Sequence, residues 1–255
     1  MKEGEVKMVE KIAVIALVLA AYASIASATI APYINVTGSA ILVANPNIAG
    51  WWPFEEGLGN ITDDVSQNSN IGTLRPACPN CPNWTAGKKG LALLFDGIND
   101  YVNVSDHPTL NFTNYSIEAW FNATDDVDQI IVMKGENNRE ILRLEIDKEK
   151  LDFIVRNTAN QKFEAKDSVN IVRNRWFHAV GVFNGTHIAL FKDGSRIAVD
   201  TFSGALKEAH TPLVIGARSD LGGGLFFGGK IDNVRIWNRA LTDTEIASLF
   251  AKDGA

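Results

Sequence analysis

The 255-residue sequence has few of the residues that usually build metal centres and nucleophile sites. It contains only 2 cysteines and 4 histidines. The histidines, which lack the short spacings of metal ligands, are His107, His178, His187 and His210. No nucleophile-elbow motif occurs. Neither a zinc centre nor α/β-hydrolase chemistry therefore has support in this chain.

The chain also lacks an excess of positive charge. Its 24 Lys and Arg residues against 30 Asp and Glu residues give a formal net charge of −6, and no Lys/Arg cluster stands out. Because phosphate binding requires a basic surface, this composition argues against a nucleic-acid partner. Hydrophobic residues make up 46% of the chain, which is enough for the core of one large β-sandwich.

The two cysteines lie close together in "CPNCP", as Cys78 and Cys81. A zinc site of this kind would need a second pair of ligands. A redox motif would precede a helix, whereas Pro79 and Pro82 indicate a tight loop. In an exported chain the spacing therefore predicts a local disulfide that stiffens this loop.

No charged residue occurs between Lys11 and Glu55. Within this stretch, the apolar run 12–23 has the length of a signal-peptide core, and "ASA" at 26–28 fits a cleavage site. The rival interpretation is an uncleaved anchor or pilin-like helix, because 12–30 is long enough to span a bilayer. Both interpretations predict a secreted or cell-surface protein.

Asparagine sequons agree with export. The N-x-S/T motif, which is the acceptor site for N-glycosylation, occurs at eight positions, more than the roughly two expected by chance. These positions are Asn35, Asn60, Asn83, Asn103, Asn111, Asn114, Asn122 and Asn184. We expect a glycosylated extracellular face, the alternative being a polar β-surface rich in Asn and Thr.

Past residue 49 the chain consists of short apolar runs separated by turn residues. Asn184-Gly185 and Asp193-Gly194 are strong hairpin signals, because both central positions of such turns need positive φ. The one convincing helix is "LTDTEIASLF" near the C-terminus, where Thr242 and Glu245 form a capping box. The pattern predicts an all-β, two-sheet antiparallel sandwich with a short C-terminal helix.

Several motifs occur in an order that resembles one known family. "GWWPFEEGLGN", "LLFDGINDYVNV" and "GKIDNVRIWNRALTDTEIASLF" resemble segments of laminin-G-like (concanavalin A-like lectin/glucanase) jelly-roll domains. The resemblance implies a jelly roll of two antiparallel sheets that binds glycans or proteins. The resemblance covers residues 50 to about 250. Together with the apolar N-terminal run, it predicts a signal peptide or anchor at 1–28, an apolar linker or extra strand at 29–49, and a laminin-G-like domain at 50–255.

The stretch "LEIDKEKL" places carboxylates at Glu145, Asp147 and Glu149. This E-x-D-x-E spacing matches the signature of laminarinase-type glucanases, which present acids along one strand face. However, "DKEK" is typical of a turn, and no Trp or Tyr between Trp120 and Trp176 could form a sugar platform. We therefore interpret the stretch as a hairpin that splits the acids, with a glycoside hydrolase as the alternative.

Oxygen ligands are dense in "NITDDVSQNSN", which makes calcium the better metal hypothesis. The first and last strands of an antiparallel jelly roll commonly pair, which would bring one further carboxylate to this loop. The predicted structural Ca²⁺ ligands are Asp63, Asp64, Ser66, Asn70 and Asp232. The alternative is a solvated polar loop.

We expect an exported, non-catalytic module that binds a carbohydrate or a cell-surface protein. Loop aromatics are the expected ligand contacts, namely Trp51, Trp52 and Trp84. A second hypothesis is a structural or assembly subunit of a cell-surface layer or filament. It is motivated by the apolar segment 29–43, which could self-assemble by adding a strand to a neighbouring sheet.

Overall fold

A computed structural model describes residues 34–36, 39–41, 45–125, 127–136, 139–219 and 225–254. The chain divides into two units, Met1–Asn45 and Pro46–Ala255. In the first unit, two short strands pair antiparallel, β1 (Ile34–Val36) and β2 (Ser39–Ile41). The predicted signal peptide or anchor lies outside the described residues. No helix within the described ranges is both long and apolar enough to cross a bilayer.

The second unit is the predicted two-sheet antiparallel sandwich, and the described residues are mostly strand, with 50% in strands and 7% in helices. Sheet I has the strand order β13-β12-β11-β10-β17-β8-β5-β4. Its strands are β4 (Ile61–Thr62), β5 (Gly72–Arg75), β8 (Tyr101–Val104), β10 (Gln129–Glu136), β11 (Arg139–Asp147), β12 (Lys150–Arg156), β13 (Lys162–Asn170) and β17 (Leu213–Ile215).

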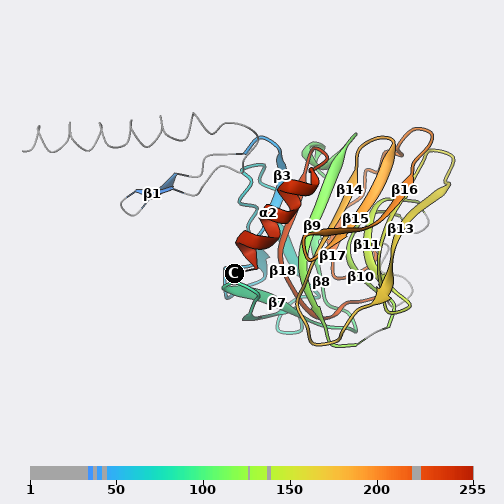
Figure 1. Cartoon of the computed structure of the whole chain (residues 1–255). Coiled ribbons are helices and arrows are strands. Elements are labelled where there is room, and N and C mark those ends of the chain that lie inside the picture. Colours follow the sequence, from blue (N-terminus) through green and yellow to red (C-terminus); the bar gives the residue numbers. More distant parts are fainter. Residues whose placement is uncertain are drawn as a thin grey trace, which may run out of the picture. The chain divides into compact units, whose positions relative to one another are not determined.

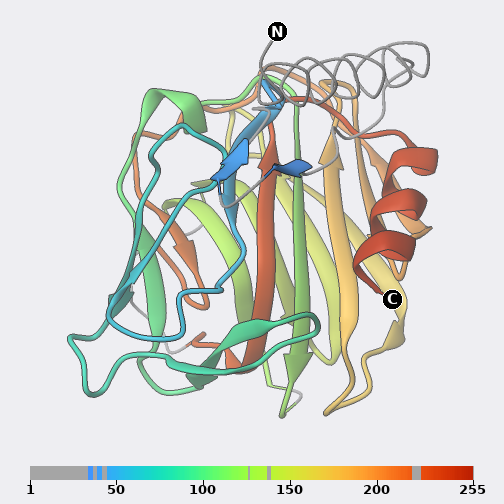
Figure 2. The ribbon, with the colours of Figure 1, turned by 90° about the vertical axis from the view of Figure 1, so that its left-hand side faces the viewer.

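Sheet II has the order β16-β15-β14-β9-β18-β7-β6, with β3 paired to β18. Its strands are β3 (Ile48–Trp52), β6 (Asn83–Ala86), β7 (Leu91–Asp96), β9 (Tyr115–Ala123), β14 (Phe177–Phe183), β15 (His187–Lys192), β16 (Ser195–Thr201) and β18 (Gly228–Trp237). A short 3-10 helix, Pro108–Leu110, precedes β9. The helix α2 (Asp243–Asp253) lies against sheet II (Figures 1 and 2).

The core forms between the inner faces of the two sheets, because alternate residues of each strand are apolar. In sheet I, Leu144 and Phe153 are fully buried cross-strand partners. Phe153 meets sheet II at Gly181, where an added Cβ would lie 2.4 Å from the phenyl ring. Tyr115 packs beside the same ring, with centroids 6.2 Å apart. At Gly181 the sheets thus approach too closely for any side chain.

The first and last strands of the sandwich pair, as expected for a jelly roll. Arg235 of β18 lies opposite Trp51 of β3. Ile48 and Ala49 are buried members of β3. The folded unit therefore begins at Pro46 rather than at residue 50.

Two local predictions are confirmed at the ends of the sandwich. Cys78 and Cys81 form a disulfide. At α2, the Thr242 hydroxyl accepts from the Glu245 amide, and the Glu245 carboxylate accepts from the Thr242 amide at 2.8 Å. This capping box satisfies amides that would otherwise lack partners in the first helical turn.

Candidate functional site

The acidic stretch 144–151 is a β-hairpin, which confirms its interpretation from sequence. Strand β11 ends at Asp147 and β12 begins at Lys150, while Lys148 and Glu149 form the turn with φ of 51° and 66°. The Glu149 carboxylate accepts a hydrogen bond from the Asn170 side chain, whereas Glu145 pairs with Arg143. The three acids therefore do not form the single strand row that the hydrolase alternative requires.

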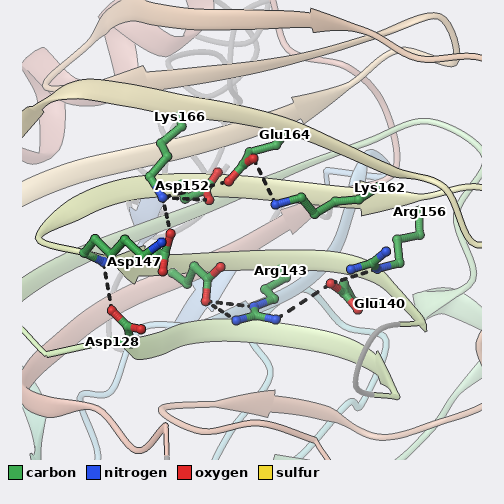
Figure 3. A network of polar contacts seen from close by, with 11 residues as sticks. Asp128, Glu140, Arg143, Asp147, Asp152, Arg156, Lys162, Glu164 and Lys166 are labelled. Atoms are coloured by element: carbon green, nitrogen blue, oxygen red, sulfur yellow. Dashed lines mark hydrogen bonds and ion pairs between the residues drawn. The ribbon is translucent and has the colours of Figure 1, made fainter.

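The outer face of sheet I carries a different set of charges on neighbouring strands (Figure 3). Alternation turns apolar residues of β11, β12 and β13 inward and charged residues outward. Glu145 lies directly opposite Asp152, which in turn lies opposite Lys166. We call this set the charged ladder: Glu140, Arg143, Glu145, Asp147, Asp152, Arg156, Lys162, Glu164 and Lys166.

One half of the charged ladder is organised by arginine. Arg143 donates from Nε to Glu145 Oε2 at 2.8 Å, and its Nη1 lies 3.7 Å from Glu140 Oε1. Arg156 Nε lies 3.1 Å from the same Glu140 oxygen. The Glu140 side chain is fully buried, so these two guanidinium groups are the counter-charges that make its burial tolerable.

The other half surrounds one lysine. Lys166 Nζ contacts Asp147 and lies 3.7 Å from Asp152 and 3.9 Å from Glu164. Ligand atoms of these three acids all lie within 4.8 Å of one another, and no other trio of acidic, His or Cys side chains in the described ranges does so. Because the Lys166 ammonium sits among them, it supplies the cation that this acidic trio needs.

Two acids of the charged ladder have pKa values shifted in opposite directions. Burial raises the pKa of Asp152 to about 9, and its hydrogen bond with Glu164 adds to this rise. The same hydrogen bond lowers the pKa of Glu164 to about 2. These opposite shifts predict that Asp152 is the protonated partner at neutral pH and donates to the Glu164 carboxylate.

The pKa of Glu145 is raised as well. Burial raises its pKa to about 7, although Arg143 acts in the opposite direction.

The Asp152→Asn substitution tests whether Asp152 is protonated in the folded chain at neutral pH. Because the folded chain holds a proton that the unfolded chain releases, the Asp152 contribution to stability falls as pH rises from about 4 to about 9. Asparagine keeps an N–H donor toward Glu164 and does not titrate. We expect D152N to be more stable by about 1 kcal/mol at pH 8, with little difference at pH 4.

Thermal melts of both proteins across this pH range measure the effect. Asp147→Asn is the control, because it removes a partner of Lys166 and should give no gain. Parallel pH profiles for wild type and D152N would contradict the protonation of Asp152.

A ligand approaching the outer face of sheet I meets only part of the charged ladder. Side chains of Asp147 and Lys166 are each 26% exposed, and that of Glu164 is 30% exposed. The Asp152 side chain is fully buried behind them. The accessible groups are thus anionic acceptors next to a cationic donor, held in place by buried neighbours.

The predicted calcium loop is organised by its own hydrogen bonds. Asp64 Oδ1 accepts from the amides of Trp51 and Ser66 at 2.9 Å, and Oδ2 accepts from the amide of Asn70 at 3.0 Å. Asn70 also donates from Nδ2 to the Ala49 carbonyl. Asp64 and Asn70 therefore tie the loop to β3, and the calcium site stays a prediction.

Two other predicted ligands of this site are placed differently. Asp63 donates its amide to Glu56 Oε1 at 2.7 Å. Asp232 Oδ2 accepts from the amides of Lys88 and Lys89 at 2.9 and 3.2 Å. The hydrogen bonds of Asp232 in the described structure thus lead to the loop before β7 rather than to the 63–70 loop.

The three tryptophans predicted to bind ligand do not form one site. Trp52 is fully buried and donates from Nε1 to the Asn70 carbonyl, so its assignment as a ligand contact is wrong. Trp51 is half-buried, and its Nε1 donates to Asn233 Oδ1 at 2.7 Å. The Arg235 guanidinium carbon lies 4.5 Å from the centroid of the Trp51 ring. Trp84 packs at the edge of the core and donates to the Gly59 carbonyl.

The predicted glycosylation sites differ in exposure. Side chains at Asn60, Asn83, Asn111, Asn114 and Asn184 are exposed, and those at Asn103 and Asn122 are half-buried. The side chain of Asn35 lies outside the described part of the structure. Modification at any of these positions stays a prediction.

The fold agrees with one family. A family model described as the concanavalin A-like lectin/glucanases superfamily matches residues 96–247, and the chain belongs to this superfamily. Among curated proteins, none matches the chain.

Solved structures of binding domains share the fold. The binding domain of Paraclostridial Mosquitocidal Protein 1 is 14% identical, with a TM-score of 0.68, and the match covers 81% of this chain and 52% of that one. The botulinum neurotoxin serotype G binding domain is 13% identical, with a TM-score of 0.63 and coverage of 81% and 51%. The chain thus spans about half the length of these toxin domains.

A third structure is matched almost over its full length. Domain 4 of AbnA, a GH43 extracellular arabinanase from Geobacillus stearothermophilus solved with arabinotriose, is 16% identical. Its TM-score is 0.59, and the match covers 80% of this chain and 98% of that domain. Identities this low establish a common fold, and function has to be argued from the site.

Proposed function

We propose that this protein is an exported, non-catalytic module that binds a carbohydrate through the charged ladder. The observation that carries the proposal is the partly exposed group of Asp147, Glu164 and Lys166, which buried neighbours hold in fixed positions. Sugar hydroxyls both donate and accept hydrogen bonds, so adjacent carboxylate and ammonium groups suit them. Preorganised side chains also lose little entropy on binding.

The same geometry supports a binding role over a hydrolytic one. A retaining glycosidase needs two working carboxyl groups about 5 Å apart with a sugar between them. Here two acids of the charged ladder have raised pKa values, and both are buried: the side chain of Asp152 is fully buried and that of Glu145 is 3% exposed. No glycosidic oxygen can reach a carboxyl group in either position.

The comparisons support this proposal at the level of class. The matched toxin structures are binding domains, and the matched arabinanase domain was solved with a bound oligosaccharide. A jelly roll of this superfamily that offers fixed polar groups on one outer face fits the same general role.

A glycan array probed with the full chain, followed by calorimetry with the best ligand, tests the proposal. We expect Glu164→Gln or Lys166→Gln to weaken binding about tenfold or more, which corresponds to about 1.4 kcal/mol. The control is Arg175→Gln just before β14 of sheet II, an exposed residue paired with Asp193, which should bind as wild type does.

Two outcomes would contradict the proposal. One is silence across a broad array, and the other is unchanged affinity in both ladder variants. Release of reducing sugar from the bound glycan would contradict the non-catalytic assignment.

A further inference from the structure

The outer face of sheet II contains an apolar hollow that the proposed function does not use. Its volume is about 380 Å³, in the size range of small-ligand pockets. Val182, Ala189 and Val199 lie side by side on β14, β15 and β16 and form part of its floor. Val199 is 57% exposed. This face therefore leaves apolar surface open beside the N-terminus of α2, in contrast to the charged outer face of sheet I.

The rim of the hollow is polar. His187 and Asn184 line it at the β14–β15 hairpin. Arg196 and Asp243 line another part and form an ion pair, with Arg196 Nε donating to Asp243 Oδ2 at 3.1 Å. An apolar floor with hydrogen-bonding groups around it matches a sugar ring, whose faces carry C–H groups and whose edge carries hydroxyls.

One rim residue is itself a sequon asparagine. Asn184 Oδ1 accepts hydrogen bonds from Thr186 N, Thr186 Oγ1 and His187 N at 3.0, 3.1 and 2.8 Å. These bonds fix the side-chain amide with its oxygen turned into the hairpin. The side chain is exposed, and its Nδ2 is the atom that N-glycosylation modifies.

We infer that Asn184 carries an N-linked glycan whose first sugars pack into the hollow. Nδ2 attacks the anomeric carbon of a lipid-linked oligosaccharide, the C–N bond forms, the lipid phosphate leaves, and Nδ2 loses one proton. Because the asparagine lines the hollow, the attached sugar reaches the floor without further ordering of the chain. The inference shares with the proposed function only the export of the chain, so either can fail alone.

Another sequon shows why Asn184 is singled out. In the sequon of Asn114, the Ser116 hydroxyl is buried, donates to the Arg239 carbonyl and accepts from the Leu241 amide. Asn83, on β6, is exposed but does not line the hollow. Asn83 is therefore a matched control for an asparagine that can be glycosylated but has no hollow beside it.

The test is expression of the full chain through a eukaryotic secretory pathway, with glycopeptide mapping and thermal melts before and after enzymatic trimming of the glycans. We expect Asn184 to be occupied. Trimming should lower Tm by about 2–4 °C, the shift that a modest change in unfolding free energy produces in a domain of this size. In Asn184→Asp, which keeps the acceptor oxygen of the hairpin, trimming should leave Tm unchanged.

Two further variants separate the packing of the glycan in the hollow from the glycosylation of Asn184. Asn83→Asp should keep the full Tm response to trimming, because it leaves Asn184 intact. Val199→Ser should keep Asn184 occupied but reduce the response, since it makes the floor polar. An unmodified Asn184 in the secreted protein would overturn the inference. So would an occupied Asn184 whose trimming leaves Tm unchanged, as happens if another segment covers the hollow.

Discussion

Replacing Glu118 with alanine is expected to lower the free energy of unfolding by about 3–5 kcal/mol. Glu118 is fully buried on β9 and accepts from His178 Nε2 at 3.0 Å and from Arg235 Nη1 at 3.1 Å. It also accepts from Trp237 Nε1 at 3.3 Å. Alanine would leave three buried donors without this acceptor, including a permanent positive charge whose other acidic partner is Asp253 at 2.8 Å.

The pKa of Glu118 makes this prediction depend on pH. Burial raises the pKa, but Arg235 and then His178 outweigh burial and lower it to about 2. A carboxyl group whose folded pKa is lowered stabilises the fold above its unfolded value, near 4.5, and that stabilisation is lost as pH falls toward 2. The difference between wild type and E118A should therefore be largest at neutral pH and shrink below pH 4.

Urea unfolding at pH 7 and pH 3 measures both effects. Glu118→Gln is the matched control, because it keeps the side-chain volume and one acceptor oxygen but removes the charge. It should destabilise less than alanine at pH 7. A loss below 1 kcal/mol for E118A at pH 7 would show that the three donors find other partners.

Sequence patterns with local causes predicted their structures correctly. The hairpin at 148–149 followed from a run of polar residues between two apolar periods, and two residues suffice to close such a turn. The capping box of Thr242 and Glu245 is likewise formed within four residues. The run of short strands and turns predicted a two-sheet sandwich, whereas the jelly roll was implied by the resemblance to laminin-G-like domains.

Contacts between distant strands were not predictable in the same way. Asp152 and Lys166 meet because β12 and β13 pair in one particular register, which the acid spacing along β11 does not encode. The signal that was available is alternation in "KLDFIVR" and "KFEAKDSVN", where apolar residues take one face and charges the other. With β12 and β13 paired, this alternation places Asp152, Glu164 and Lys166 on one surface of the sheet.

The assignment of Trp52 failed for a local reason. Trp51 and Trp52 are neighbours on β3, so their side chains point to opposite faces of the sheet. One of the two had to enter the core, and the loop character of the preceding residues obscured this. Trp51 stays on the outer side, where Arg235 covers it.

Replacing Asp106 with alanine is expected to destabilise the fold by about 3–5 kcal/mol at pH 7. The Lys134 side chain is fully buried on β10, and its Nζ donates to Asp106 Oδ1 at 2.7 Å and to the Thr211 carbonyl at 2.6 Å. Without Asp106 the ammonium keeps only a neutral acceptor. Burial lowers the pKa of Lys134, and Asp106 is the group that opposes this shift.

The Lys134→Met substitution separates the effect of the lysine charge on stability from the effect of its side-chain packing. Methionine fills a similar volume without a charge, so this variant should lose less stability than D106A, and the double variant should recover most of what D106A loses. A lysine whose folded pKa lies below its unfolded value near 10.5 releases its proton first in the folded state. Stability of D106A should therefore rise as pH increases from 7 toward 10. Urea unfolding of the three variants at pH 7 and pH 9.5 checks this, and additive losses in the double variant would show that the two side chains stabilise the fold independently.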